Sequence, residues 1–272
     1  MEQKTIGVCL YGGLGNQLFE LFAGLSKAID ENKTISIYLL QNVRPFYFNN
    51  LFKTLNKYVL NNIDNSINSK IYYYEPFFHY SKIPENAEII NGFYQSEKYF
   101  SHNYDKIIDM LKIKNMQEKN KLYFKKTIAI HFRIGDYLEA RHINRHGILQ
   151  PSYYFNALCE LSTKINVNEY KFVIFSEKCN DEHINKYIEI LNLPIEFIKI
   201  YDIIPNLTEY EELLYMSNCN HFIIANSTYS WWGAYLSNNK NKIVICPNDW
   251  FGPELKNNNL CDLFPTNWIK IT

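Results

Sequence analysis

The sequence predicts an α/β protein made of two doubly wound, Rossmann-like domains that face a central cleft. Short apolar, β-branched runs recur along the chain, helical patterns separate them, and a lysine-rich stretch divides them into two groups. Continuous apolar runs are typical of parallel strands buried on both faces, and strand–helix alternation is typical of βαβ units. Ligands of such sheets bind beyond the carboxyl ends of the strands.

The first group of elements occupies the N-terminal part of the chain. The sequence predicts strands over residues 5–11, 34–40 and 88–93, and helices over residues 16–31 and 96–113. Residues 41–84 are rich in asparagine and aromatic residues and look irregular, so they are expected to form surface or a groove wall. Residues 112–126 are polar and lysine-rich, and are therefore expected to form the linker.

The second group is more regular than the first. Strands are predicted over residues 127–133, 170–176, 195–202, 221–227 and 242–247, and helices over residues 152–165, 179–191, 208–219 and 227–239. Thr208 with Glu211 three residues later matches a capping box, which marks a helix start. The predicted domains are residues 1–120 and residues 121–272.

Composition excludes several classes of protein. The 28 basic and 28 acidic residues of the 272-residue chain cancel, and their distribution lacks the clustered basic excess of a nucleic-acid-binding protein. No apolar run reaches the roughly 18 residues of a membrane span. The N-terminus lacks the pattern of a signal peptide, and the six scattered cysteines form no CxxC, which predicts reduced thiols in a cytoplasmic protein.

The stretch YGGLGNQLF joins the first strand to the first helix. Gly12, Gly13, Gly15, Asn16 and Gln17 lie there, where helix N–H groups are unpaired and the helix dipole favours an anion. The spacing is neither GxGxxG nor a P-loop. A tight turn and a ligand-binding loop are equally good interpretations of this stretch alone.

The stretch HFRIGD ends the first strand of the second group. In a strand His131 and Arg133 point to one face, and Phe132 and Ile134 point to the other. An arginine at a strand end can grip a phosphate with two hydrogen bonds. Asp136 is expected at the same mouth. The alternative is an Arg133–Asp136 ion pair that closes a turn.

The stretch NSTYSWWG follows the fourth strand of the second group. Ser227 and Thr228 are placed to cap the next helix, whose N-terminus can hold a phosphate. Asn226 precedes them. For Trp231 and Trp232 core packing is the preferred interpretation.

Ser176 and Glu177 also follow a strand. The carboxylate is placed to hold a ribose or a base, or else to cap the next helix. The chain contains no DxD, no HExxH, no Cys/His ligand spacing and no GxSxG. A metal-dependent transferase with a two-carboxylate clamp is therefore not expected.

Four stretches together resemble the α-1,2-fucosyltransferases of glycosyltransferase family 11: GGLGNQLFE, NGFYQSEKYF, HFRIGDY and MSNCNHFIIANSTYSWWGAYL. The resemblance spans nearly the whole chain in the right order. It implies a GT-B fold, with an acceptor-side domain over residues 1–120 and a GDP-fucose-binding domain over residues 121–272. It also implies inversion at the sugar carbon and no required metal or other cofactor.

The reaction that the resemblance implies gives these residues candidate roles. The candidate catalytic residues are Asn16, Arg133 and Asp136, with Glu97 and Glu139 as alternative bases. The candidate donor-binding residues are Gly13, Gly15, His131, Arg133, Ser176, Glu177, Asn226, Ser227 and Thr228. The candidate acceptor-binding residues are Tyr94, Gln95 and Glu97.

The expected reaction moves L-fucose from GDP-fucose to the 2-hydroxyl of a galactose-containing oligosaccharide. Three alternatives stay open: another GDP-sugar, another fucose linkage, or a glycan- or nucleotide-binding protein that has lost catalysis.

Overall fold

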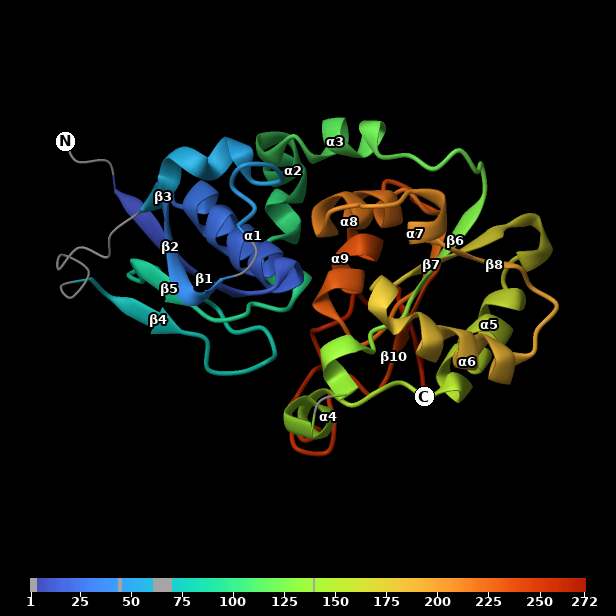
Figure 1. Cartoon of the computed structure of the whole chain (residues 1–272). Helices are drawn as coiled ribbons and strands as arrows, with labels where there is room; N and C mark the ends of the chain where they lie inside the picture. The colour runs from blue at the N-terminus through green and yellow to red at the C-terminus, as the bar shows by residue number, and fades with distance from the viewer. Residues whose placement is uncertain (1–3, 44–45, 61–69, 139) are drawn as a thin grey trace. The chain divides into compact units, whose positions relative to one another are not determined.

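The computed structural model describes residues 4–43, 46–60, 70–138 and 140–272, with backbone alone for residues 41–43, 136, 138, 140 and 141. The chain divides into two compact units (Figure 1). Unit 1 comprises residues 1–116 and 258–265, and unit 2 comprises residues 117–257 and 266–272. The sequence assigned everything after residue 120 to the second domain, whereas residues 258–265 pack with unit 1.

Unit 1 is built around a parallel sheet of order β3-β2-β1-β5-β4. Its strands are β1 (Thr5–Gly12), β2 (Thr34–Val43), β3 (Val59–Leu60), β4 (Tyr72–Tyr74) and β5 (Ile89–Asn91). Helix α1 (Leu14–Asp30) packs against β1 (Figure 1), and its apolar side chains, such as Leu18 and Phe22, are fully buried. A short 3-10 helix, η1 (Lys53–Tyr58), precedes β3, so the described part of the stretch expected to be irregular includes η1, β3 and β4.

Residues 96–119 differ from the predicted helix and linker. Two 3-10 helices, η3 (Glu97–Tyr99) and η4 (Ser101–Asn103), precede α2 (Tyr104–Leu111), and α3 (Ile113–Lys119) lies inside the predicted linker. Two residues of this polar segment are buried, which its composition did not predict. Ile113 is fully buried, and the buried Gln117 amide donates to the Ser217 hydroxyl and the Leu236 carbonyl.

Unit 2 has a parallel sheet of order β11-β10-β9-β6-β7-β8. Its strands are β6 (Thr127–His131), β7 (Lys171–Phe175), β8 (Phe197–Lys199), β9 (His221–Ile223), β10 (Val244–Pro247) and β11 (Ile269–Ile271). Its α-helices are α4 (Ala140–His146), α5 (Pro151–Ser162), α6 (Asp181–Leu191), α7 (Ile200–Ile203), α8 (Glu209–Ser217) and α9 (Thr228–Tyr235). Its 3-10 helices are η5 (Gly135–Leu138), η6 (Val167–Glu169) and η7 (Lys178–Asn180).

The two parallel sheets with their helices confirm the predicted α/β class and its two Rossmann-like units. The capping box at Thr208 and Glu211 is also confirmed, because both of its reciprocal bonds are present. The strand predicted over residues 195–202 is wrong in length, since only Phe197–Lys199 is extended and α7 follows at once. Helix α4 and strand β11 were not predicted.

The register of the unit 2 sheet brings three strand ends to one edge. His131 of β6 lies opposite Phe175 of β7, and Ile130 lies opposite Ile223 of β9. The residues that follow these strands are therefore neighbours in space although they are far apart in sequence. This edge carries most of the residues that the sequence singled out.

Candidate active site

Arg133 lies two residues beyond the end of β6, at the carboxyl edge of the unit 2 sheet. Its Nη1 is 3.2 Å from Oε1 of Glu177, which follows β7. Its guanidinium carbon lies 5.0 Å from the centre of the Tyr137 ring, a distance typical of a cation–π contact. The guanidinium side chain is 28% exposed. A carboxylate and an aromatic ring thus hold a permanent cation at the mouth of the sheet.

His131 is the last residue of β6, and its side chain is buried. Burial, and then the nearby charge of Arg133, lower its pKa from 6.5 to about 3. The imidazole is therefore neutral at physiological pH and can serve as a donor or an acceptor, but not as a cation. The side chain of Asp136 lies outside the described residues, so the alternative Arg133–Asp136 ion pair is not tested. Glu139, an alternative base, also lies outside them.

We predict that His131 makes the protein less stable in acid. The unfolded chain takes up a proton below pH 6.5, whereas the folded chain does so only near pH 3, so stability falls as the pH drops through this window. Urea unfolding of the wild type and of His131→Gln at several pH values measures this difference. Parallel pH profiles for the two proteins would show that His131 is not buried in its neutral form.

Three buried polar atoms at this edge have no hydrogen-bond partner within the described part of the chain. They are His131 Nδ1, Ser176 Oγ and Asn226 Oδ1, from the residues that end or follow three adjacent strands. Buried polar atoms in native proteins are nearly always satisfied, so each exception needs an explanation. A polar ligand or ordered water bound at this edge supplies one.

The Asn226 amide nitrogen ties two loops together. It donates to the carbonyls of His146 (2.7 Å), Gly147 (3.3 Å) and Trp250 (3.3 Å). If Asn226 binds the sugar-nucleotide donor, as expected, it does so through its unpartnered Oδ1. Asn226 also lines a pocket of about 280 Å³, whose other lining residues come from the end of α4 to the start of α5 and from the ends of β10 and β11 with the residues that follow them.

Helix α9 begins directly after this edge. Ser227 is its N-cap, as expected, but the Ser227 side chain makes no capping hydrogen bond, and this part of the prediction is wrong. Thr228 is the first helical residue and is partly exposed. Trp231 and Trp232 are fully buried, which confirms their interpretation as core residues.

The glycine loop of unit 1 leads into α1 two residues earlier than predicted. Gly13 is the N-cap of α1, and Asn16 lies inside the first turn. Gly12 adopts a φ of 75°, which favours glycine, and a Cβ on Gly13 would meet no atom within 4 Å. Gly15 is buried in the first turn. The loop therefore exposes backbone next to an uncapped helix start.

The expected acceptor residues follow β5. Gln95 is buried, and its Nε2 donates to Asn16 Oδ1 at 3.2 Å. Tyr94 is 1% exposed and its ring packs edge-on against the ring of Tyr99, so its acceptor-binding role stays a prediction. Glu97 begins η3 and is partly exposed.

Three acidic side chains with raised pKa values were not among the site residues predicted from the sequence. Glu20 on α1 is fully buried, accepts the Tyr11 N–H at 3.0 Å, and has a pKa well above the ordinary value because of burial. Burial raises the pKa of Glu75 to about 7. Burial, followed by Glu209 and Glu177, raises that of Glu212 to about 8. Glu20 ends the quoted motif GGLGNQLFE and could have been found, whereas Glu75 lies in the aromatic stretch with no local pattern.

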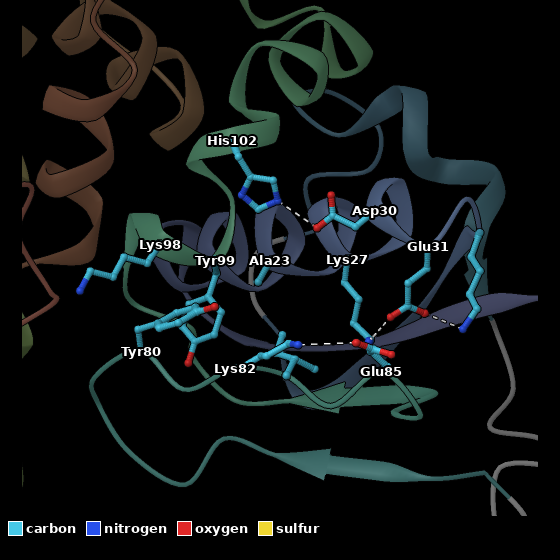
Figure 2. A pocket seen from close by; sticks show the side chains of 12 residues that line it. Ala23, Lys27, Asp30, Glu31, Tyr80, Lys82, Glu85, Lys98, Tyr99 and His102 are labelled. Atoms are coloured by element: carbon cyan, nitrogen blue, oxygen red, sulfur yellow. Dashed lines mark hydrogen bonds and ion pairs between the residues drawn. The ribbon is translucent and has the colours of Figure 1, made fainter.

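A second pocket lies in unit 1, with a volume of about 600 Å³ (Figure 2). It is lined by the C-terminal half of α1, by Lys33, and by residues of 80–85 and 98–102. Several of its charged groups are paired with one another, as in Lys27 with Glu31 and His102 with Asp30. None of the residues predicted for the active site lines it. No helix in the described part of the chain is both long and apolar enough to cross a membrane.

Two Rossmann-like units with a cationic, polar strand edge fit a glycosyltransferase. The family model for glycosyl transferase family 11 matches residues 2–272, and the chain belongs to this family. The α-1,2-colitosyltransferase of Escherichia coli is 27% identical over 296 residues, covering 96% of this chain and 97% of that protein.

A second relative, the O-antigen biosynthesis glycosyltransferase WbnK of Escherichia coli, is 27% identical over 317 residues, covering 97% of this chain and 99% of that protein. Among solved structures, fucosyltransferase NodZ from Bradyrhizobium matches with a TM-score of 0.44 and 10% identity, covering 87% of this chain and 94% of that one.

Proposed function

We propose that this glycosyltransferase moves L-fucose from GDP-β-L-fucose to the 2-hydroxyl of a galactoside and inverts the anomeric carbon. The observation that carries the proposal is Arg133, held by Glu177 at the strand mouth of a chain that matches family 11 over nearly its whole length. The three unpartnered polar atoms at the same edge support a polar ligand there. GDP and a deoxy sugar offer the phosphates, hydroxyls and base that such atoms bind.

The reaction places its largest new charge on the leaving phosphate. The acceptor oxygen bonds to the anomeric carbon while the bond from that carbon to the β-phosphate oxygen breaks, through an oxocarbenium-like state. Fixed hydrogen-bond donors stabilise the developing negative charge. We assign this role to the guanidinium of Arg133, with neutral His131 as a further donor to phosphate. Asn16 and the backbone N–H groups at the start of α1 form a second set of donors.

The acceptor hydroxyl must lose a proton during the transfer. We assign the base to Asp136, and Glu97 and Glu139 remain the alternatives. Comparing the pH–rate profiles of Asp136→Asn and Glu97→Gln tests which of Asp136 and Glu97 is the base. Loss of turnover in one variant alone identifies the base.

Colitose is the second candidate for the transferred sugar, because one relative is an α-1,2-colitosyltransferase. Colitose is fucose without its 3-hydroxyl. A site that hydrogen-bonds a substrate hydroxyl rejects the analogue lacking it by a large factor, whereas an apolar site discriminates weakly. The ratio of kcat/KM for the two donors therefore reports whether the site contacts this hydroxyl.

The deciding experiment incubates the purified chain with GDP-fucose, GDP-colitose or GDP-mannose and a panel of β-galactosides. The product linkage and anomeric configuration are then determined by NMR. A 2-deoxygalactoside is the matched control acceptor and should give no product. Transfer to another hydroxyl, or no transfer from any of the three donors, would overturn the proposal.

We predict that turnover needs no divalent metal. The chain has no DxD, and the positive charge of Arg133 stands at the strand mouth where a metal would otherwise neutralise phosphate. Turnover in excess chelator should equal turnover in buffer within about twofold. A loss that Mn²⁺ or Mg²⁺ restores would contradict this prediction.

A further inference from the structure

Glu75 joins the ends of two strands in unit 1. It directly follows β4, and its N–H donates to the carbonyl of Asn91, the last residue of β5, at 2.9 Å. Its carboxylate reaches over the turn that follows β5. There Oε2 accepts the N–H of Tyr94 at 2.8 Å, and the nearby Tyr99 hydroxyl and Phe93 N–H favour the charged carboxylate and lower its pKa against the effect of burial. One carboxylate thus meets the backbone of the turn that follows β5.

The turn that Glu75 holds has a demanding conformation. Tyr94 has a φ of 51°, in the left-handed region that non-glycine residues seldom adopt. A Cβ on Gly92 would lie 2.3 Å from the Cβ of Glu75 and 2.9 Å from its Oε2, so only glycine allows this approach. Backbone in a sparsely populated region persists where surrounding contacts enforce it. The Glu75 carboxylate is one such contact, together with the Ser96 N–H bond to the Tyr94 carbonyl and the burial of the Tyr94 ring.

The same turn presents Gln95 to the glycine loop. The Gln95 side chain is buried, and its Nε2 donates to Asn16 Oδ1 at 3.2 Å. Because the Asn16 oxygen is the acceptor in this bond, the bond fixes which end of the Asn16 amide is the donor end. The orientation of Asn16 therefore depends on the turn, and the turn depends on Glu75.

We propose that Glu75 is a positioning residue for the transfer reaction, which acts by locking the turn over residues 92–95 so that Gln95 orients the Asn16 amide toward the donor. This inference rests on the proposed function, because it needs Asn16 to serve the reaction. In this role Glu75 acts through Gln95 and Asn16 rather than on a substrate.

The ionised carboxylate is the form that holds the turn. The Tyr94 N–H donates to Oε2, and a hydrogen bond to an ionised acceptor is stronger than one to a neutral carboxyl. The titratable groups that face Glu75 are Glu20 on α1, Tyr11 at the end of β1, and Tyr94 and Tyr99. Among the described residues no lysine or arginine forms an ion pair with it. With its pKa raised to about 7 by burial, Glu75 changes charge within the working pH range.

The pH dependences of activity and stability should then have opposite signs. Turnover should rise as Glu75 ionises between about pH 6 and pH 8. Its folded-state pKa lies above the ordinary 4.5, so its contribution to stability is complete below pH 4.5 and is lost as the pH rises through 7. If Glu75 only supported the fold, turnover and stability would both fall as the pH rises.

The test compares the wild type with Glu75→Gln over this pH range, using the GDP-sugar that the donor panel identifies. At pH 8 kcat should fall about two- to tenfold, the worth of one lost hydrogen bond. The donor KM should stay unchanged. The kcat of the variant should be flat from pH 6 to pH 8, because glutamine does not titrate. A wild-type-like rise of kcat in the variant would overturn the proposal.

Glu85→Gln is the matched control. Glu85 lies in the same connection between β4 and β5, but its side chain is 87% exposed and pairs only across 3.5 Å with Lys82. This change should alter neither kcat nor its pH profile.

Coupling to Asn16 separates positioning from general support of the fold. Glu75→Gln combined with Asn16→Ala should cost no more turnover than Asn16→Ala alone, because both changes act through one amide. Multiplying costs would overturn the proposal. If Glu75→Gln does not fold, Gln95→Ala takes its place in this cycle with the same expectation.

Unfolding by urea at pH 5 and pH 8 needs no donor and tests the contact by itself. The wild type should lose stability relative to Glu75→Gln as the pH rises. If no GDP-sugar is turned over, the proposed function fails while this measurement still decides on the contact. Equal pH dependence in both proteins would overturn the role of the carboxylate.

Discussion

Replacing Arg133 with lysine should lower turnover by about 10²–10³-fold. That is the usual loss when one preorganised donor to a developing oxyanion is removed. Lysine keeps the charge, but it lacks the planar fork that can grip a phosphate with two parallel bonds. Lysine also loses the stacked contact with the Tyr137 ring and the fixed geometry of the pair with Glu177. The loss should appear in kcat as well as in kcat/KM, because charge on the phosphate grows in the transition state.

Arg145→Lys is the matched control in the same unit. Arg145 is on α4, its side chain is 54% exposed, and its Nε lies 4.0 Å from Oε1 of Glu254. An exposed pair of this length contributes little. Turnover should therefore stay within about twofold of the wild type. If Arg133→Lys keeps half of the wild-type activity, Arg133 does not bind the leaving phosphate.

Replacing Asn16 with alanine should lower turnover about 100-fold, because a donor to the phosphate or sugar is lost. The melting temperature should fall by a few degrees, because the buried Gln95 amide loses its acceptor, at a cost of about 1–3 kcal/mol. The N-cap of α1 is Gly13, so Asn16→Ala does not incur the loss of about 0.5–2 kcal/mol that removal of an N-cap causes.

Asn103→Ala is the matched control with the opposite expected result. Asn103 is buried, and its amide donates to Asp30 Oδ1 at 2.7 Å and to the Ser26 hydroxyl at 3.1 Å, away from the glycine loop. Its loss should lower the melting temperature and leave turnover per folded molecule unchanged. Melting and turnover are measured on the same preparations. A destabilised but fully active Asn16→Ala would show that the glycine loop is a structural turn and does not serve the reaction.

The sequence by itself determined the fold class and the places where ligands could bind. Parallel strands buried on both faces need continuous apolar runs, and such runs are visible without any knowledge of long-range contacts. Polar residues directly after these runs, such as Arg133 and Ser176, must lie at the carboxyl edge of a parallel sheet. The burial of Trp231 and Trp232 was likewise evident from their helical, apolar surroundings.

Only the tertiary structure decided which of these polar groups meet, and in which charge state. Arg133 and Glu177 are 44 residues apart, and Asn16 and Gln95 are 79 apart, so no local pattern links them. Long-range contacts also explain why residues 258–265 pack with unit 1. They explain as well why Ile113 and Gln117 are buried within the predicted linker. Glu75 is the clearest case. Its pKa and its hold on a strained turn come from burial against β5 and η3, and burial is a property of the folded chain rather than of the sequence around a residue.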